Sequence, residues 1–202
     1  ITTANTTYAG GGGGGTADNP GGSGGAGGGG AGGDDPSNPG VDGTTNTGGG
    51  GGGAGGNAHP RLSGAGGSGI VVVRSALKCT VFTQGSSSNE TAIINCGACQ
   101  VGQFKASSTL NVLDSENSQL AHFLVVAGGA AGAYDSGAGG GGAGGVRTSY
   151  PSPTSVLRAQ QLSISPGPYT ITVGAGGAAG QCAPGAGSNS SFSIITASGG
   201  GG

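Results

Sequence analysis

Charged and large apolar side chains are scarce in this sequence of 202 residues. Asp, Glu, Lys and Arg together make up 7%, aromatic residues 4%, and Met and Trp are absent, whereas glycine occurs 54 times. Glycine buries no side chain and loses the most backbone entropy on folding, so this composition cannot fill a conventional hydrophobic core. The chain is therefore either disordered or held together by backbone hydrogen bonds that need no side chains.

The charge pattern and the short apolar runs exclude two classes of partner. The net charge is −2, and the six basic residues are scattered: Arg61, Arg74, Lys78, Lys105, Arg147 and Arg158. Without a basic patch, we expect no nucleic-acid partner. Apolar runs such as residues 70–73 are far shorter than the roughly 20 residues that span a bilayer, so we expect no membrane span. The chain begins at Ile1, and we interpret it as a mature or excised piece of a longer precursor.

Cysteines and glycosylation sequons indicate an oxidising, extracellular location at a cell surface or appendage. The disulfide candidates are Cys79, Cys96, Cys99 and Cys182, and the N-glycosylation candidates are Asn5, Asn89 and Asn189. Cys96-x-x-Cys99 also has the spacing of a redox pair or of half a zinc site. Neither a βαβ unit nor a second cysteine pair accompanies it, so a structural disulfide is favoured. Cys182 pairs either with the middle segment or with another chain.

Small side chains inside the glycine tracts recur three residues apart, as in Ser23 and Ala26 or Ala175 and Ala178. A period of three is that of the polyproline II helix. Glycine in that conformation leaves every backbone N–H and C=O free to bond to a neighbouring tract, so a bundle of polyglycine II helices can fold without a side-chain core. The period is imperfect, and a flexible Gly/Ser linker is the alternative.

Apolar, β-branched segments around the tracts favour the folded alternative. They span residues 70–74, 122–127, 162–165, 169–173 and 191–196. Segments of this length and composition predict short strands. We expect an all-β, irregular fold: a small β-sandwich base that carries packed polyglycine II helices, with almost no α-helix. Residues 76–119, where glycine becomes rare and three cysteines occur, are predicted to be a separate insert or linker between residues 1–75 and 120–202.

Two stretches resemble the glycine-rich domain of phage tail fibres, adhesins and microbial surface proteins. The first half of that domain resembles residues 123–129 (FLVVAGG), 139–148 (GGGGAGGVRT), 165–177 (SPGPYTITVGAGG) and 189–200 (NSSFSIITASGG). Its second half resembles residues 8–12 (YAGGG), 40–50 (GVDGTTNTGGG) and 67–74 (GSGIVVVR). The resemblance implies a β-sandwich with polyglycine II helices, a structural or receptor-binding role, and no catalysis.

The order of the two halves departs from that family, because the half that comes first in the family comes last here. Three arrangements follow. Residues 120–202 are completed by residues 1–75 of the next copy, which would build a filament; or the sequence is a piece of a tandem-repeat precursor, divided within a domain; or one chain folds as a permuted domain. The insert, with residues 96–104 (CGACQVGQF), resembles the ephrin-receptor-like cysteine-rich repeats of protist and algal surface proteins, which implies disulfide pairing.

No motif in the sequence indicates catalysis, a cofactor or a metal site. His59 and His122 are the only histidines, no nucleophile elbow accompanies them, and no glycine tract continues into the Lys-Ser/Thr of a phosphate-binding loop. We expect a non-enzymatic structural subunit of an extracellular filament or appendage that self-associates into a polymer, with glycans as further candidate partners. A receptor-binding adhesin is the alternative, and an ice-binding protein is the third.

Overall fold

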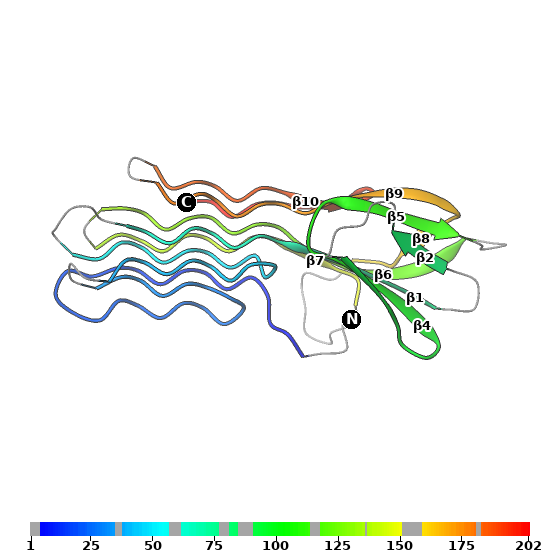
Figure 1. Ribbon diagram of the computed structural model, residues 1–202, viewed down its shortest axis with the longest axis horizontal. Coiled ribbons are helices and arrows are strands. Elements are labelled where there is room, and N and C mark those ends of the chain that lie inside the picture. Colours follow the sequence, from blue (N-terminus) through cyan, green and yellow to red (C-terminus); the bar gives the residue numbers. More distant parts are fainter. Residues whose placement is uncertain are drawn as a thin grey trace.

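The computed structural model describes residues 5–34, 38–56, 62–76, 81–84, 91–113, 118–135, 137–150, 159–180 and 183–202. These residues form two parts that follow each other along the longest axis (Figure 1): a β-sandwich, and a bundle of extended glycine tracts that projects from it. No α-helix occurs in the described part of the chain. The prediction of an all-β, irregular fold is confirmed.

The strands of the sandwich form two antiparallel sheets. One has the order β3-β4-β1-β6-β7, with β8 also paired to β6, and the other has the order β11-β10-β9-β5-β2. The strands are β1 (Ile70–Ala76), β2 (Val81–Gln84), β3 (Thr91–Asn95), β4 (Cys99–Phe104), β5 (Ser108–Leu113), β6 (Gln119–Val126), β7 (Val146–Thr148), β8 (Leu162–Ile164), β9 (Gly167–Thr172), β10 (Ser190–Phe192) and β11 (Ile195–Ala197).

Both faces of the first sheet are buried, which explains why β1 is an uninterrupted apolar run rather than an alternating one. Successive side chains of a strand point to opposite faces. Val71 and Val73 therefore join the core between the two sheets, and Ile70 and Val72 join a second apolar cluster on the other face. All four side chains are at most 2% exposed. The core between the sheets also contains Phe104, Phe123 and Phe192, each 0% exposed.

The pairing of β1 with β6 joins the two glycine-rich segments within one chain. Ile70 lies opposite Val126 and Val73 lies opposite Phe123 in an antiparallel register. One chain thus supplies both central strands of the first sheet, as in the permuted-domain arrangement and not in the one where a second copy completes residues 120–202. Because β6 already occupies this edge of β1, a strand from a second copy cannot pair there.

Residues 76–119 contribute strands to both sheets. From this segment, β4 pairs with β1 on the side opposite β6, and β5 pairs with β9 in the other sheet. The side chains of Phe104 and Leu110 enter the core between the sheets. The composition sets this segment apart as an insert, but its strands β4 and β5 belong to the sandwich.

Every third backbone N–H along a glycine tract donates to the same neighbouring tract. In residues 48–56, the N–H groups of Gly50, Gly53 and Gly56 donate to the carbonyls of Gly10, Gly13 and Thr16 at 2.8–2.9 Å. A second row in the same tract, Gly51 and Ala54, donates to Ala130 and Ala133, each at 2.9 Å. Hydrogen bonds in rows with a period of three are those expected for the polyglycine II conformation.

These rows arrange the tracts in three hexagonally packed layers. Hydrogen bonds connect neighbours within each layer: 20–26, 10–16, 138–145 and 198–202 in layer 1; 28–33, 48–56, 127–133 and 183–188 in layer 2; and 40–44, 62–69 and 174–180 in layer 3. Tract 48–56 has six neighbours: 28–33 and 127–133 in its own layer, 10–16 and 138–145 in layer 1, and 40–44 and 62–69 in layer 3. The tracts run along the same axis over the whole bundle (Figure 1).

Glycine is required inside this lattice because neighbouring backbones lie too close for a side chain. A Cβ atom at Gly51 would overlap the carbonyl oxygen of Gly64, and one at Gly52 would overlap that of Ala31. Residues 48–54 are all buried, so the atoms in the way are rigid backbone and not flexible side chains. At Gly14, on the outer surface of layer 1, the nearest atom to a Cβ would be the Ala138 oxygen at 3.6 Å.

The lattice predicts opposite effects for two Gly→Ala substitutions. Gly51→Ala should lower the free energy of unfolding by at least about 2 kcal/mol, because the added methyl forces backbones apart. Gly14→Ala should raise that of the monomer by about 0.4–1 kcal/mol, because alanine restricts the unfolded chain and its methyl makes only an ordinary contact with the Ala138 oxygen in the folded one. Equilibrium denaturation in urea measures both. Equal effects at the two positions would contradict the packing described here.

Candidate functional site

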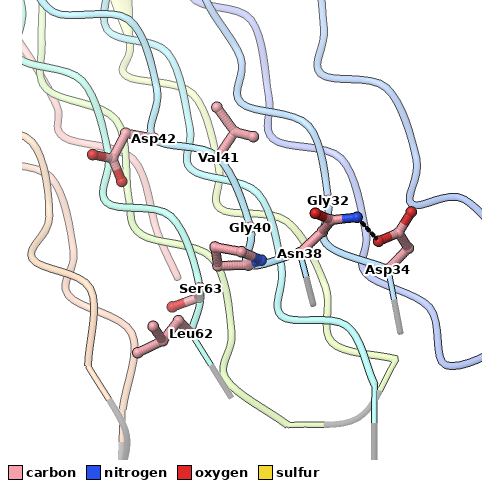
Figure 2. A pocket seen from close by; sticks show the side chains of 9 residues that line it. Gly32, Asp34, Asn38, Gly40, Val41, Asp42, Leu62 and Ser63 are labelled. Atoms are coloured by element: carbon pink, nitrogen blue, oxygen red, sulfur yellow. Dashed lines mark hydrogen bonds between the residues drawn. The ribbon is translucent and has the colours of Figure 1, made fainter. Parts of the chain in front are cut away.

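An open groove of about 620 Å³ lies at the end of the bundle, where tracts 28–33, 40–44 and 62–69 meet turns of the chain. It is lined by Gly32, Asp34, Asn38, Pro39, Gly40, Val41, Asp42, Leu62 and Ser63. Figure 2 shows the carboxylate of Asp34 beside the amide of Asn38, with Asp42 further along the groove. The groove thus combines carboxylates with aliphatic side chains.

Backbone and side-chain hydrogen bonds hold both carboxylates in place. Asn38 Nδ2 donates to Asp34 Oδ1 at 2.5 Å, and the backbone N–H of Ala65 donates to Asp42 Oδ1 at 2.7 Å. The Asp42 side chain thereby connects two adjacent tracts of layer 3. Each carboxylate has a second oxygen, so the groove offers hydrogen-bond acceptors to a polar ligand.

Apolar side chains form the remaining wall of the groove. Val41 is 54% and Leu62 is 50% exposed, although both are large and aliphatic. Ser63 is 7% exposed, and its hydroxyl has no hydrogen-bond partner in the described structure. A pocket that places a few polar groups between aliphatic surfaces suits a ligand with both hydroxyl or amine donors and apolar faces.

A polar cluster surrounds His122 on β6. Its ring nitrogens lie 3.4 Å from Ser149 Oγ and 2.7 Å from Gln161 Nε2, and its ring meets that of Tyr150 edge to face at 5.5 Å. The Ser149 hydroxyl also accepts the backbone N–H of Phe123 at 2.9 Å. These contacts attach the segment after β7 to β6, which is a packing role. His59 lies outside the described residues.

Among the cysteines, Cys96 and Cys99 lie within disulfide-bonding distance in the turn between β3 and β4. The N–H of Cys96 donates to the carbonyl of Cys99 at 2.9 Å, and Gly97 has a φ of 66°, in the left-handed region that glycine tolerates best. Cys99 is 6% exposed and packs in the second apolar cluster. Cys79 and Cys182 lie outside the described residues.

Two of the three N-glycosylation candidates are described, and both are exposed: Asn5 and Asn189. Asn189 Oδ1 accepts the backbone N–H of Gly199 at 2.9 Å, so this side chain caps a row of the glycine lattice. Asn89 lies outside the described residues. No group of three or more His, Cys, Asp and Glu side chains in the described ranges is arranged to hold a metal ion.

The family comparison matches residues 1–76 and 105–202 to the glycine-rich domain. The match covers most of the chain and both parts of the fold, and the chain belongs to the glycine-rich domain family. Residues 77–104, which include the segment that resembles cysteine-rich repeats, fall outside the match. No curated protein and no solved structure matches the chain. A helix long and apolar enough to cross a membrane is not found in the described part of the chain.

Burial of Tyr8 against the second apolar cluster predicts a loss of stability at high pH. Desolvation raises the pKa of its phenol above the usual value of 10.0, and a side-chain hydrogen bond with Thr6 partly offsets this. The stabilisation is complete below the pKa of the unfolded chain and is lost as the pH rises through that of the folded one, because the unfolded chain loses the proton first. Tyr8→Phe should reduce the fall in unfolding free energy above about pH 10 in denaturant titrations.

The short loop between Cys96 and Cys99 predicts a modest disulfide contribution. Their sequence separation is 3, and closing so small a loop in the unfolded chain stabilises the fold by about 2 kcal/mol. Replacing both cysteines by serine should lower the free energy of unfolding by about that amount. Ala98→Ser, at an exposed position of the same turn, is the matched control and should have almost no effect. A double variant as stable as the control would argue against a bond in the folded protein.

Proposed function

We propose that this chain is a non-catalytic structural subunit of an extracellular filament or surface appendage. The observation that carries the proposal is the three-layer lattice, in which the backbone itself bonds each tract to its neighbours. Such a bundle resists bending and local unfolding, since one tract cannot leave without breaking rows of hydrogen bonds to several others. A stiff body of this kind supplies mechanical support and does not require a substrate.

An extracellular location is supported by two features of the described chain. Asn5 and Asn189 lie in sequons at exposed positions, where a glycan can be attached without disturbing the core. The Cys96–Cys99 pair suits an oxidising compartment. Because β1 already pairs with β6 of the same chain, assembly by strand exchange is not part of the proposal. Copies associate through the outer surfaces of folded domains.

A receptor-binding adhesin is the second candidate, and the groove beside Asp34 and Asp42 favours it. The groove lies at the free end of the bundle, away from the sandwich, where a receptor has access. Its acceptor-rich wall and the exposed Val41 and Leu62 match the hydroxyls and the apolar faces of a sugar. Ice binding, the third function, needs a flat and regular face of Thr or Ala, and Asp42 and Leu62 interrupt the outer surface of layer 3.

Electron microscopy of the secreted, purified protein tests the structural proposal. We expect filaments with a regular axial repeat, since copies of a rigid body that meet through one fixed contact repeat at a fixed distance. The same preparation at several concentrations shows whether length depends on the amount of protein. Discrete single particles under all of these conditions would contradict the proposal.

A pair of carboxylate variants separates the two candidates. If the protein is an adhesin, Asp34→Ala combined with Asp42→Ala should abolish the adhesion of protein-coated beads to cells or immobilised glycans. If it is a structural subunit, the same variant should assemble as the unchanged protein does. Asp18→Ala, which removes a carboxylate outside the groove, is the matched control. Loss of adhesion in the groove variant alone, with no filaments seen in either sample, would favour the adhesin.

A further inference from the structure

Layers 1 and 3 give the bundle two outer surfaces of different character. On layer 3, side chains cover the outside and take part in the lattice: Asp42 accepts the N–H of Ala65, and the Ser68 hydroxyl accepts that of Asn46 at 3.0 Å. The tracts of layer 1 (10–16, 20–26, 138–145 and 198–202) contain no charged residue and consist almost entirely of glycine, alanine and serine. The N–H groups of Ala175 and Ala178 in layer 3 have no backbone hydrogen-bond partner in the described structure. The two surfaces therefore differ in side chains: the outside of layer 3 carries them, and the outside of layer 1 is nearly bare backbone.

Backbone donors of layer 1 are left without partners at the lattice period. Tract 10–16 has three rows of N–H groups, each with a spacing of three residues. One row donates to residues 27–33 and a second donates to tract 138–145. Gly11 and Gly14 form the third row. In tract 138–145, the corresponding third row is Gly140 and Ala143. The N–H groups of these four residues have no hydrogen-bond partner in the described structure. Like the open edge of a sheet, these rows can receive a further chain segment.

At four positions of the same layer, packing within the monomer does not require glycine. A Cβ atom at Gly11 or Gly14 would come no closer than 3.9 Å or 3.6 Å to another atom, and one at Gly139 or Gly201 would meet nothing within 4 Å. None of the four has the positive φ that favours glycine. Elsewhere in the lattice, nearly every glycine faces a backbone that a Cβ would overlap. All four exceptions lie in layer 1, at the surface where the next layer of a hexagonal lattice would pack.

We propose that layer 1 is the surface through which two copies of this chain associate, with layer 1 of one copy packed on layer 1 of the other. Unpaired N–H and C=O groups of one copy would bond to those of its partner, and the bare glycines would allow the backbones to approach as closely as inside the bundle. The inference rests on the proposed structural function and names one of its contact surfaces. Because a twofold contact closes at two copies, a filament built from such dimers needs a second, different contact.

A second copy suits this surface better than another partner does. A partner must present backbone donors and acceptors in rows with a period of three and must lack side chains along those rows. Layer 1 itself has both properties. A self-complementary contact of this kind has twofold symmetry and brings each patch against its equal, so charges on the patch would repel one another. The tracts of layer 1 carry none.

The orientation of the partner's tracts does not restrict this contact. Within the bundle, tract 10–16 bonds to tract 28–33 in the same chain direction and to tract 20–26 in the opposite direction. Polyglycine II rows therefore accept either direction in this protein. Two layers related by a twofold axis can therefore bond whether the facing tracts run in the same chain direction or in opposite directions, provided that their axes are aligned.

Sedimentation equilibrium of the full chain between about 10 μM and 1 mM tests the proposal, together with hydrogen–deuterium exchange at Gly11 and Gly14. We expect a dimer whose formation slows exchange of these two amides. The triple variant Gly11→Ala, Gly14→Ala, Gly139→Ala should weaken dimerisation at least tenfold, because each methyl holds the backbones apart. Its thermal unfolding reports whether the monomer is intact, which open space at all three positions predicts.

The matched control adds heavy atoms to the opposite surface. Ala175→Ser combined with Ala178→Ser changes two exposed positions of layer 3 and should dimerise as the unchanged protein does. A monomer throughout the concentration range, or equal dimerisation by the layer 1 variant, would overturn the proposal. Filaments that persist in the layer 1 variant would overturn this surface and leave the structural function standing. A layer 1 dimer that forms without any filaments would support this surface and contradict the structural function.

Discussion

Hydrogen bonding between backbones, repeated every third residue, is the constraint on which the rest of this structure depends. Each inner tract bonds to neighbours in its own layer and in the layers on both sides, so its N–H groups are used without any side-chain core. Fixing glycine costs more conformational entropy than fixing any other residue. Only a lattice that gives nearly every residue of an inner tract a hydrogen bond, and lets backbones pack in contact, offsets that cost.

The sandwich supplies what the lattice lacks, namely a register. Glycine tracts are chemically alike, so one tract can slide along another by three residues and recover the same hydrogen bonds. The β-strands prevent this. β1 continues directly from tract 62–69, and tract 127–133 continues directly from β6, so the fixed pairing of Ile70 with Val126 sets how those two tracts lie against each other. Side-chain caps such as Ser190 Oγ on the N–H of Gly174 strengthen the junction between the two parts.

The sequence predicts those parts of the fold in which side chains differ from one residue to the next. Residues 70–74 and 169–173 are rich in β-branched and aromatic side chains and are preceded by glycine or proline, and strands are found at both places: β1 spans Ile70–Ala76 and β9 spans Gly167–Thr172. The glycine tracts reveal their period of three but not their neighbours, because identical residues cannot specify partners. Composition sets residues 76–119 apart as an insert because glycine becomes rare there and cysteines appear, yet Cys99–Phe104 within this segment is β4, a strand paired with β1. The groove escapes prediction too, because Asp34, Asp42 and Ser63 come together only through the stacking of three tracts.

The lattice also determines where a site can form on this protein. Inside the bundle, the backbones leave no room for a side chain, so chemistry is confined to turns, to the sandwich and to the outer layers. The carboxylates of Asp34 and Asp42 lie in the groove at the free end, and each is held in a fixed position by a hydrogen bond. The outer surface of layer 3 carries side chains such as Asp42 and Ser68, whereas the outer positions of layer 1 are mostly glycine with unpaired N–H groups. The two contacts proposed for the bundle therefore lie apart: the proposed ligand groove uses side chains at the free end, and the proposed association with another copy uses the backbone of layer 1.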